Sequence, residues 1–60
     1  MTTYTVCYTD EDYYKYESYF FNKSDARKFI KMNKHKWECW ELWKGKEELL
    51  DGECQRQNRV

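Results

Sequence analysis

Apolar and polar residues alternate along two stretches of the chain, residues 3–21 and 36–54, with the two-residue period of β-strands. Aromatic residues make up 20% of the chain, and nearly all of them lie on these two stretches. The acidic run Asp10–Asp12 divides the first stretch, and Gly45–Lys46 divides the second. Each stretch therefore predicts a β-hairpin, and the segment between them has the apolar spacing of a helix.

The first stretch predicts a hairpin in which a three-residue turn sets Thr9 opposite Tyr13. In this register the large apolar side chains gather on one face, whereas a slip of one residue would mix the two faces. The apolar face is expected to point toward the core: Tyr4, Val6, Tyr8, Tyr14, Tyr16, Ser18 and Phe20. The opposite face then carries Thr3, Thr5, Cys7, Thr9, Lys15, Glu17, Tyr19 and Phe21.

The middle segment has the start signal and the apolar stripe of one short helix. Asn22 is a favourable N-cap residue, and the carboxylate of Asp25 suits the positive end of the helix dipole. The helix is expected to end near Asn33 or Lys34, after about three turns. The stripe at helical spacing that is expected to face the sheet is formed by Ala26, Phe29, Ile30 and Asn33.

The second stretch predicts a hairpin with Gly45–Lys46 as a two-residue turn. The more apolar face is expected to pack against the helix: Trp37, Cys39, Glu41, Trp43, Glu48, Leu50, Gly52 and Cys54. The other face is mostly charged but includes a compact apolar patch formed by Trp40, Leu42 and Leu49. In this register Leu42 and Leu49 are direct cross-strand partners, and Trp40 lies two residues away on the same face.

Together these elements predict an α+β fold with the order ββαββ. If the third strand pairs with the first, the four-stranded antiparallel sheet has the order 2-1-3-4, and a right-handed connection places the helix on one face. Residues 1–60 are expected to form a single small domain, with residues 55–60 as a frayed tail. The sheet face without the helix is then exposed to solvent or binds a partner.

The formal net charge is zero, but the charges are segregated along the chain. Residues 1–21 carry one basic and four acidic side chains, a net charge of −3. Residues 22–36 carry six basic and one acidic side chain, a net of +5, and residues 37–60 carry four basic and six acidic side chains, a net of −2. This pattern predicts a basic helix between acidic hairpins, unlike a uniformly basic nucleic-acid binder or a uniformly acidic DNA mimic.

Neither a metal site nor a catalytic site has a signature in the sequence. Three cysteines and one histidine match the ligand count of a zinc site, but the chain has no Cys-x-x-Cys pair. The expected registers also place Cys7 on the face opposite Cys39 and Cys54. An odd number of distant cysteines favours free thiols in a reducing cytosol. Without a glycine-rich phosphate loop or a partner for His35, we expect a non-enzymatic protein with no metal or cofactor.

The N-terminal residues lack the basic start and apolar run of a signal peptide, and no stretch approaches the ~20 apolar residues of a membrane helix. These features predict a cytoplasmic protein that does not enter membranes. Lysine and tyrosine are more frequent than arginine and alanine, and proline is absent. This composition is typical of AT-rich genomes, and in so short a chain it indicates a phage or mobile element in a bacterial host.

Protein binding is the function that conflicts least with these features. A tryptophan flanked by two leucines within a charged surface is typical of an interface anchor. The expected binding residues are Trp40, Leu42, Leu49 and Tyr19. The expected partner is a second copy, which would give a homodimer, or a host protein that the chain modulates or inhibits. The alternative is nucleic-acid binding, through the aromatic sheet face or through the helix cations Arg27, Lys28, Lys31 and Lys34.

Overall fold

The strands and the helix occur in the predicted order. The computed structural model describes residues 2–54 of the 60-residue chain. Its elements are β1 (Tyr4–Thr9), β2 (Lys15–Phe20), α1 (Lys23–Asn33), the 3₁₀ turn η1 (Lys34–Lys36), β3 (Cys39–Lys44) and β4 (Glu48–Cys54). The strands form one antiparallel sheet in the order β2-β1-β3-β4. The expected α+β fold and strand order are thus confirmed, whereas the expectation for residues 55–60 lies outside the described residues.

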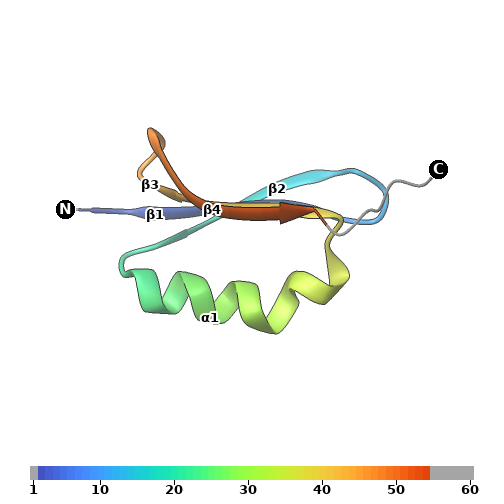
Figure 1. The fold of residues 1–60 in the computed structure, drawn as a ribbon, viewed down its shortest axis with the longest axis horizontal. Coiled ribbons are helices and arrows are strands. Elements are labelled where there is room, and N and C mark those ends of the chain that lie inside the picture. Colours follow the sequence, from blue (N-terminus) through green and yellow to red (C-terminus); the bar gives the residue numbers. More distant parts are fainter. Residues whose placement is uncertain (1, 55–60) are drawn as a thin grey trace.

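The sheet has one covered face and one uncovered face. Figure 1 shows the sheet edge-on, with α1 lying along its lower side. No other helix or strand of residues 2–54 lies against the upper side, which we call the open face. The strand order leaves β2 and β4 at the two edges and β1 and β3 in the centre.

The helix begins and ends where the sequence predicts. The Oδ1 atom of Asn22 accepts a hydrogen bond from the backbone N–H of Asp25 at 2.9 Å, as an N-cap residue does. Ala26 and Ile30 are buried on the sheet side, and Phe29 is half-buried beside them. Within residues 2–54 no helix is long and apolar enough to cross a membrane.

The core lies between α1 and the sheet. Tyr8 stacks on Trp37 with 4.3 Å between the ring centroids, and Phe29 meets the same indole ring at 5.5 Å. A single large ring can bury ~150–250 Å², so a few aromatic residues supply much of the core of a domain this small. The buried apolar residues are Val6, Ala26, Ile30, Trp37, Trp40 and Leu42. The half-buried residues packed against them are Tyr4, Tyr8, Phe20, Phe29 and Leu50.

The first hairpin keeps its predicted faces although its register differs. Thr9 lies opposite Lys15 and not opposite Tyr13, because the connecting loop has five residues, 10–14, where three were expected. Tyr13 takes a left-handed conformation with φ of 67°, which a residue other than glycine rarely adopts. A shift of two residues leaves every strand side chain on its original face. Tyr14 is the exception, because it lies in the loop and is 65% exposed where a core position was expected.

In the second hairpin, β3 and the end of β4 have their faces reversed relative to the prediction, whereas Leu49 and Leu50 keep the predicted faces. Trp40 and Leu42 are 5% and 0% exposed, so they lie in the core and not on the open face. The cause is the pairing of β3 with β1, which sets Leu42 beside Val6 and Trp40 beside Tyr8. Side chains of directly paired residues point to the same face, so Leu42 and Trp40 enter the core with their β1 partners. The expected binding residues Trp40 and Leu42 are therefore corrected to core residues.

An irregularity between β3 and β4 separates the two adjacent leucines of β4. The register shifts between Leu42 and Trp43, so that Leu49 pairs with Trp43 and not, as expected, with Leu42. Leu49 is 53% exposed, whereas Leu50 packs against the core. The turn has three residues, 45–47, where two were expected, and Gly45 adopts the positive φ of 65° that favours glycine.

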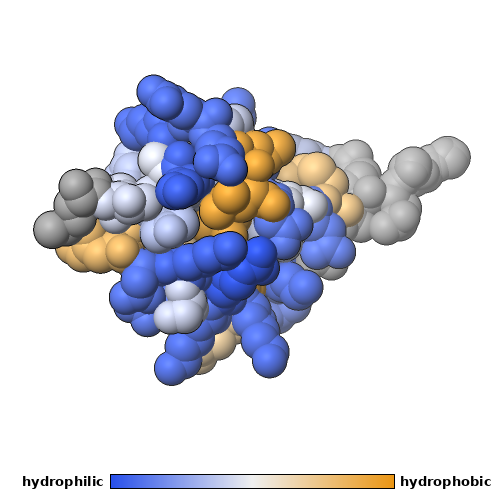
Figure 2. All heavy atoms as spheres, turned by 60° about the vertical axis from the view of Figure 1, so that its left-hand side comes forward, coloured by the Kyte–Doolittle hydropathy of each residue, from blue (hydrophilic) through white to orange (hydrophobic). Residues whose placement is uncertain are grey.

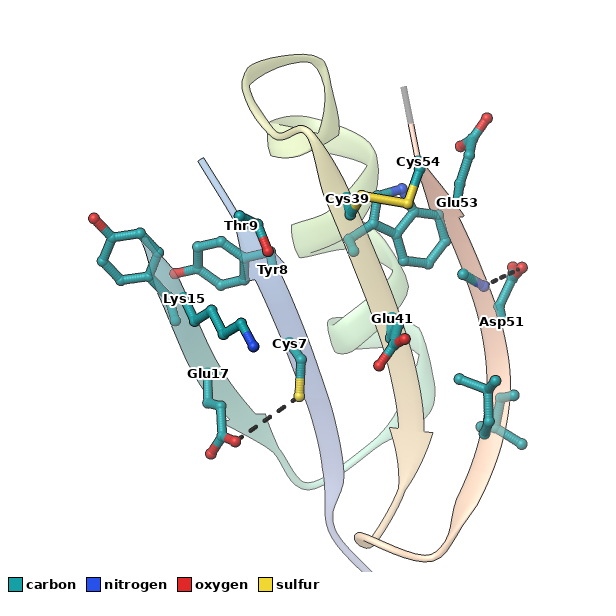
Figure 3. A pocket seen from close by; sticks show the side chains of 15 residues that line it. Cys7, Tyr8, Thr9, Lys15, Glu17, Cys39, Glu41, Asp51, Glu53 and Cys54 are labelled. Carbon is teal, nitrogen blue, oxygen red and sulfur yellow. Dashed lines mark hydrogen bonds between the residues drawn. A yellow bond between two sulfur atoms is a disulfide. The ribbon is translucent and has the colours of Figure 1, made fainter. Parts of the chain in front are cut away.

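Two of the three cysteines form a disulfide. Cys39 and Cys54 are direct cross-strand partners in β3 and β4, with 4.0 Å between their Cα atoms, and their sulfur atoms are bonded. The expectation of three free thiols is therefore wrong, and Cys7 is the free cysteine. The register also places all three on the open face (Figure 3), although we expected Cys7 on the face opposite the other two.

Candidate functional site on the open face

Four side chains form a line across the whole open face, one from each strand. Tyr19 pairs with Thr5, Thr5 pairs with Trp43, and Trp43 pairs with Leu49. Tyr19 and Leu49 are 54% and 53% exposed, and Trp43 is half-buried between them. Thr5 is buried, and its hydroxyl donates to the carbonyl oxygen of Gly45 at 3.0 Å. We call Tyr19, Thr5, Trp43 and Leu49 the aromatic row.

The next line of side chains along the strands has a thiol in the middle and one carboxylate on each side of it. Cys7 of β1 pairs with Glu17 of β2 on one side and with Glu41 of β3 on the other. Gly52 of β4 pairs with Glu41 and completes the line. We call Glu17, Cys7, Glu41 and Gly52 the acidic row. Since a strand advances ~3.4 Å per residue, the acidic row lies ~7 Å from the aromatic row.

Each ring of the aromatic row holds one carboxylate of the acidic row. The Tyr19 hydroxyl donates a hydrogen bond to Oε1 of Glu17, and the Trp43 Nε1–H donates to Oε1 of Glu41 at 3.0 Å. The bond to Glu17, together with some desolvation and the negative charge of Glu17, raises the pKa of Tyr19 above its ordinary value. The hydroxyl therefore stays protonated at neutral pH and continues to donate.

The thiol of Cys7 lies in the field of both carboxylates. Its Sγ atom is 3.9 Å from Oε2 of Glu17. Partial burial raises the pKa of Cys7 above its ordinary value, and the negative charges of Glu17 and Glu41 raise this pKa further, while the positive charge of Lys46 acts in the opposite direction. Both carboxylates would oppose a thiolate between them, so Cys7 is a protonated, weakly nucleophilic thiol at neutral pH.

A shallow hollow of about 790 Å³ extends from the acidic row toward the end of β4. Figure 3 shows Cys7 and Glu41 next to each other on this face, the disulfide farther along β3 and β4, and Glu17 and Lys15 along the β2 edge. Gly52 has no side chain, so the hollow stays open next to Glu41. The residues that line it include the small residues Cys7, Thr9 and Gly52 and the carboxylates of Glu17 and Glu41.

The structure divides the four expected protein-binding residues between two places. Tyr19 and Leu49 lie on the open face at opposite ends of the aromatic row, whereas Trp40 and Leu42 lie in the core. The sequence-based expectation missed Trp43, which was assigned to the core, and it gave no role to the carboxylates of Glu17 and Glu41. The only sequence signal for Trp43 was its two-residue spacing from Glu41, a carboxylate that should not face a core.

The helix cations lie on the other side of the molecule. Arg27 is 3.4 Å from Asp51 and Lys34 is 3.6 Å from Glu53, so acidic residues of β4 partly neutralise two of the four expected nucleic-acid contacts. Figure 2 shows hydrophilic residues over the helix and over the β3–β4 turn, with a hydrophobic patch between them at the level of the sheet. The cations therefore do not combine with the aromatic row into one surface.

Within residues 2–54 no group of three or more histidine, cysteine, aspartate or glutamate side chains is placed to hold a metal ion. His35 lies in η1, away from the open face, and it is exposed. Comparisons with protein-family models, with curated proteins and with solved structures each give no match to this chain.

Proposed function

We propose that this chain is a small, non-enzymatic protein-binding module that contacts its partner through the open face of its sheet. The observation that carries the proposal is the aromatic row, because it places an exposed tyrosine, a tryptophan and an exposed leucine in one line across four strands. Tyrosine and tryptophan contribute most of the binding energy in many protein interfaces, and charged residues commonly surround them as a rim.

We place this module in a phage or mobile element, where it modulates or inhibits a protein of its bacterial host. The composition of the chain, rich in lysine and tyrosine and without proline, supports this setting. In the reducing cytoplasm of such a host, the Cys39–Cys54 pair would exist as two thiols for much of its life. The aromatic row does not depend on that bond, because its residues lie at the opposite end of the strands.

A peptide selection tests the proposed surface. Peptides would be selected from a random displayed library on the native protein and then measured against Trp43→Ala and Tyr19→Ala. We expect the selected peptides to lose about 30-fold in affinity for Trp43→Ala, the loss typical of an anchor residue. Tyr14→Ala is the matched control, because Tyr14 is also an exposed aromatic residue but lies in the β1–β2 loop. Equal binding to all three variants would contradict the proposal.

Nucleic-acid binding through α1 is the second candidate. The observation in its favour is that Lys28 and Lys31 form no ion pair with another described residue, unlike Arg27 and Lys34. A titration with a single-stranded oligonucleotide, followed by amide NMR shifts, tests it directly. Saturable shifts around Lys28 and Lys31 that weaken with salt would favour this candidate, because phosphate contacts release counterions. The absence of shifts at low salt would exclude nucleic-acid binding through α1.

A further inference from the structure

We infer that the partner of the open face presents an arginine side chain, which lies over Cys7 between Glu17 and Glu41, beside an apolar residue that packs on the aromatic row. This inference rests on the proposed function and specifies the chemistry of the partner. The partner is a segment of another protein that has both a guanidinium group and an apolar side chain. The face is otherwise unpartnered within residues 2–54, so its charge and shape determine what it can accept.

The spacing of the two carboxylates suits a planar cation. Glu17 and Glu41 both pair with Cys7, one on each side, so their strands are separated by the width of β1 alone. Neighbouring strands lie ~4.8 Å apart, which sets the two backbones roughly 10 Å from each other. A guanidinium group has five N–H donors in one plane, and it can therefore donate to carboxylates on two of its sides at once.

Both carboxylates keep their charge available for a partner. The ion pairs between described residues are Arg27–Asp51 and Lys34–Glu53, and neither involves Glu17 or Glu41. One oxygen of each carboxylate accepts from a ring of the aromatic row, and this bond orients the side chain before any partner arrives. Among residues 2–54, the second oxygen of Glu17 meets only the weak thiol donor of Cys7, at 3.9 Å. Orienting the acceptors in advance reduces the entropy lost on binding.

The hollow and the rings add the remaining features that a guanidinium group uses. The small side chain of Cys7 leaves room above β1, where the cation would lie, and Gly52 leaves room on the far side of Glu41. The rings of Tyr19 and Trp43 stand beside it, and arginine stacks on aromatic rings more often than lysine does. Lys46 already lies 5.7 Å from the centre of the Tyr19 ring, which indicates that this ring accepts a cation. Partial burial is the largest cause of the raised pKa of Cys7, and the negative charges of Glu17 and Glu41 raise this pKa further.

The charges argue against a second copy in this position. Two open faces placed together would bring Glu17 and Glu41 of one chain near the same carboxylates of the other, because the acidic row crosses the face from β2 to β3. The arginine of the helix, Arg27, is already paired with Asp51 of its own chain. A separate protein with a basic and apolar segment has neither disadvantage, so it is the occupant that the face favours.

Two short peptides test the inference: one alternates leucine and arginine, and the other has citrulline in place of each arginine. Citrulline keeps the shape of arginine and removes its charge. Amide NMR shifts of the isotope-labelled protein would report the binding site. We expect the arginine peptide to shift Cys7, Glu17 and Glu41 and to bind at least about tenfold more tightly than the citrulline peptide. The difference should shrink as salt rises, because salt screens exposed charges.

Variants separate the charge from the apolar contacts. Glu17→Gln with Glu41→Gln should remove the preference for arginine, while Glu11→Gln with Asp12→Asn, which changes the net charge equally but in the β1–β2 loop, should preserve it. If both peptides bind equally at Tyr19, Trp43 and Leu49, the inferred cation site is wrong and the protein-binding surface stands. If neither peptide shifts the open face, the inference is overturned, and the library selection separately decides the proposed function. Self-association that the arginine peptide cannot displace, measured by sedimentation, would also overturn it.

Discussion

The two faces of the sheet use the same kinds of residues for different purposes. Trp40 and Trp43 are three positions apart on β3, yet Trp40 is 5% exposed and packed in the core, whereas Trp43 lies on the open face. On the covered face the rings contact other rings, as Tyr8 and Trp37 do. On the open face the rings instead hold carboxylates in place. The pairing of β3 with β1, and not the residue type, therefore determines which tryptophan lies in the core and stabilises the fold.

The sharpest test of this comparison exchanges each tryptophan for alanine. Trp40→Ala should lower the free energy of unfolding by about 3–5 kcal/mol, because it leaves a cavity in the core. A chain of 60 residues has about 3–9 kcal/mol in total, so this variant should lose a large part of its stability. Trp43→Ala should cost about 1 kcal/mol or less. Urea unfolding followed by circular dichroism measures both values, and a larger cost for Trp43→Ala would mean that the faces are assigned the wrong way round.

The disulfide is the next largest expected contribution, and it belongs to the open face. The bond joins residues 15 positions apart in the chain, and closing a loop of this length stabilises the fold by up to about 3 kcal/mol. Cys39→Ser with Cys54→Ser should therefore shift the urea midpoint downward without changing the native spectrum. Reducing the wild-type protein should give the same midpoint as the double variant. An unchanged midpoint in both experiments would show that the β3–β4 ladder alone holds the edge strand.

The elements of the fold could be predicted from the sequence because their signals are local. The alternation along β1 and β2 survives a register error of two residues, since a shift of two keeps every side chain on its face. The cap at Asn22 and the apolar stripe of α1 likewise depend on residues within one helical turn or two. The strand order rested on the supposition that the third strand pairs with the first, which the structure confirms, and the right-handed connection then placed the helix on one face.

The faces of the second hairpin could not be predicted because they depend on a distant pairing. Trp37 is buried as expected, but it precedes β3 and follows the turn η1, so its burial carries no information about the alternation within the strand. Counting Trp37 as a strand residue placed Cys39 and Trp43 on the covered face and Trp40 on the open face. The pairing of Leu42 with Val6, 36 positions away in the sequence, is what reverses this assignment.

The candidate site was predictable only in part for the same reason. Tyr19 and Leu49 were expected on the open face, and the structure places them there. The acidic row requires the register of β1 against both neighbours, because Glu17 and Glu41 meet only through Cys7. No local pattern in the sequence brings these two carboxylates together.

The reactivity of Cys7 measures the acidic row without any partner. Replacing Glu17 and Glu41 by glutamine removes two of the causes that raise the pKa of the Cys7 thiol, so this pKa should fall toward its ordinary value. The pH profile of alkylation by iodoacetamide, a neutral reagent, should then move to lower pH. Asp51→Asn with Glu53→Gln is the control, because these acids pair with Arg27 and Lys34 of the helix. A profile that moves equally in the control would indicate a general effect of net charge.

The smallest expected effect concerns Asp10, which organises the loop that sets the faces of β2. Its carboxylate accepts hydrogen bonds from the backbone N–H groups of Asp12 and Tyr14 and from the Tyr16 hydroxyl, at 2.9, 3.1 and 3.0 Å. Desolvation alone would raise the pKa of Asp10, but these bonds together lower it below its usual value near 3.8. The stabilisation is therefore complete above pH 3.8 and is lost as the pH falls through the lowered value.

Comparing the wild-type protein with Asp10→Asn tests this loop directly. At neutral pH the variant should be slightly less stable, because a neutral amide is a weaker acceptor than a carboxylate. The difference in urea midpoint should shrink as the pH falls below 3.8, where the wild-type carboxyl also becomes neutral. If the difference in urea midpoint stays the same at acidic pH, the shape of the Asp10 side chain, and not its charge, stabilises the loop. In that case the left-handed conformation of Tyr13, and not Asp10, would be the feature that sets the register of β2 and so decides which of its side chains reach the open face.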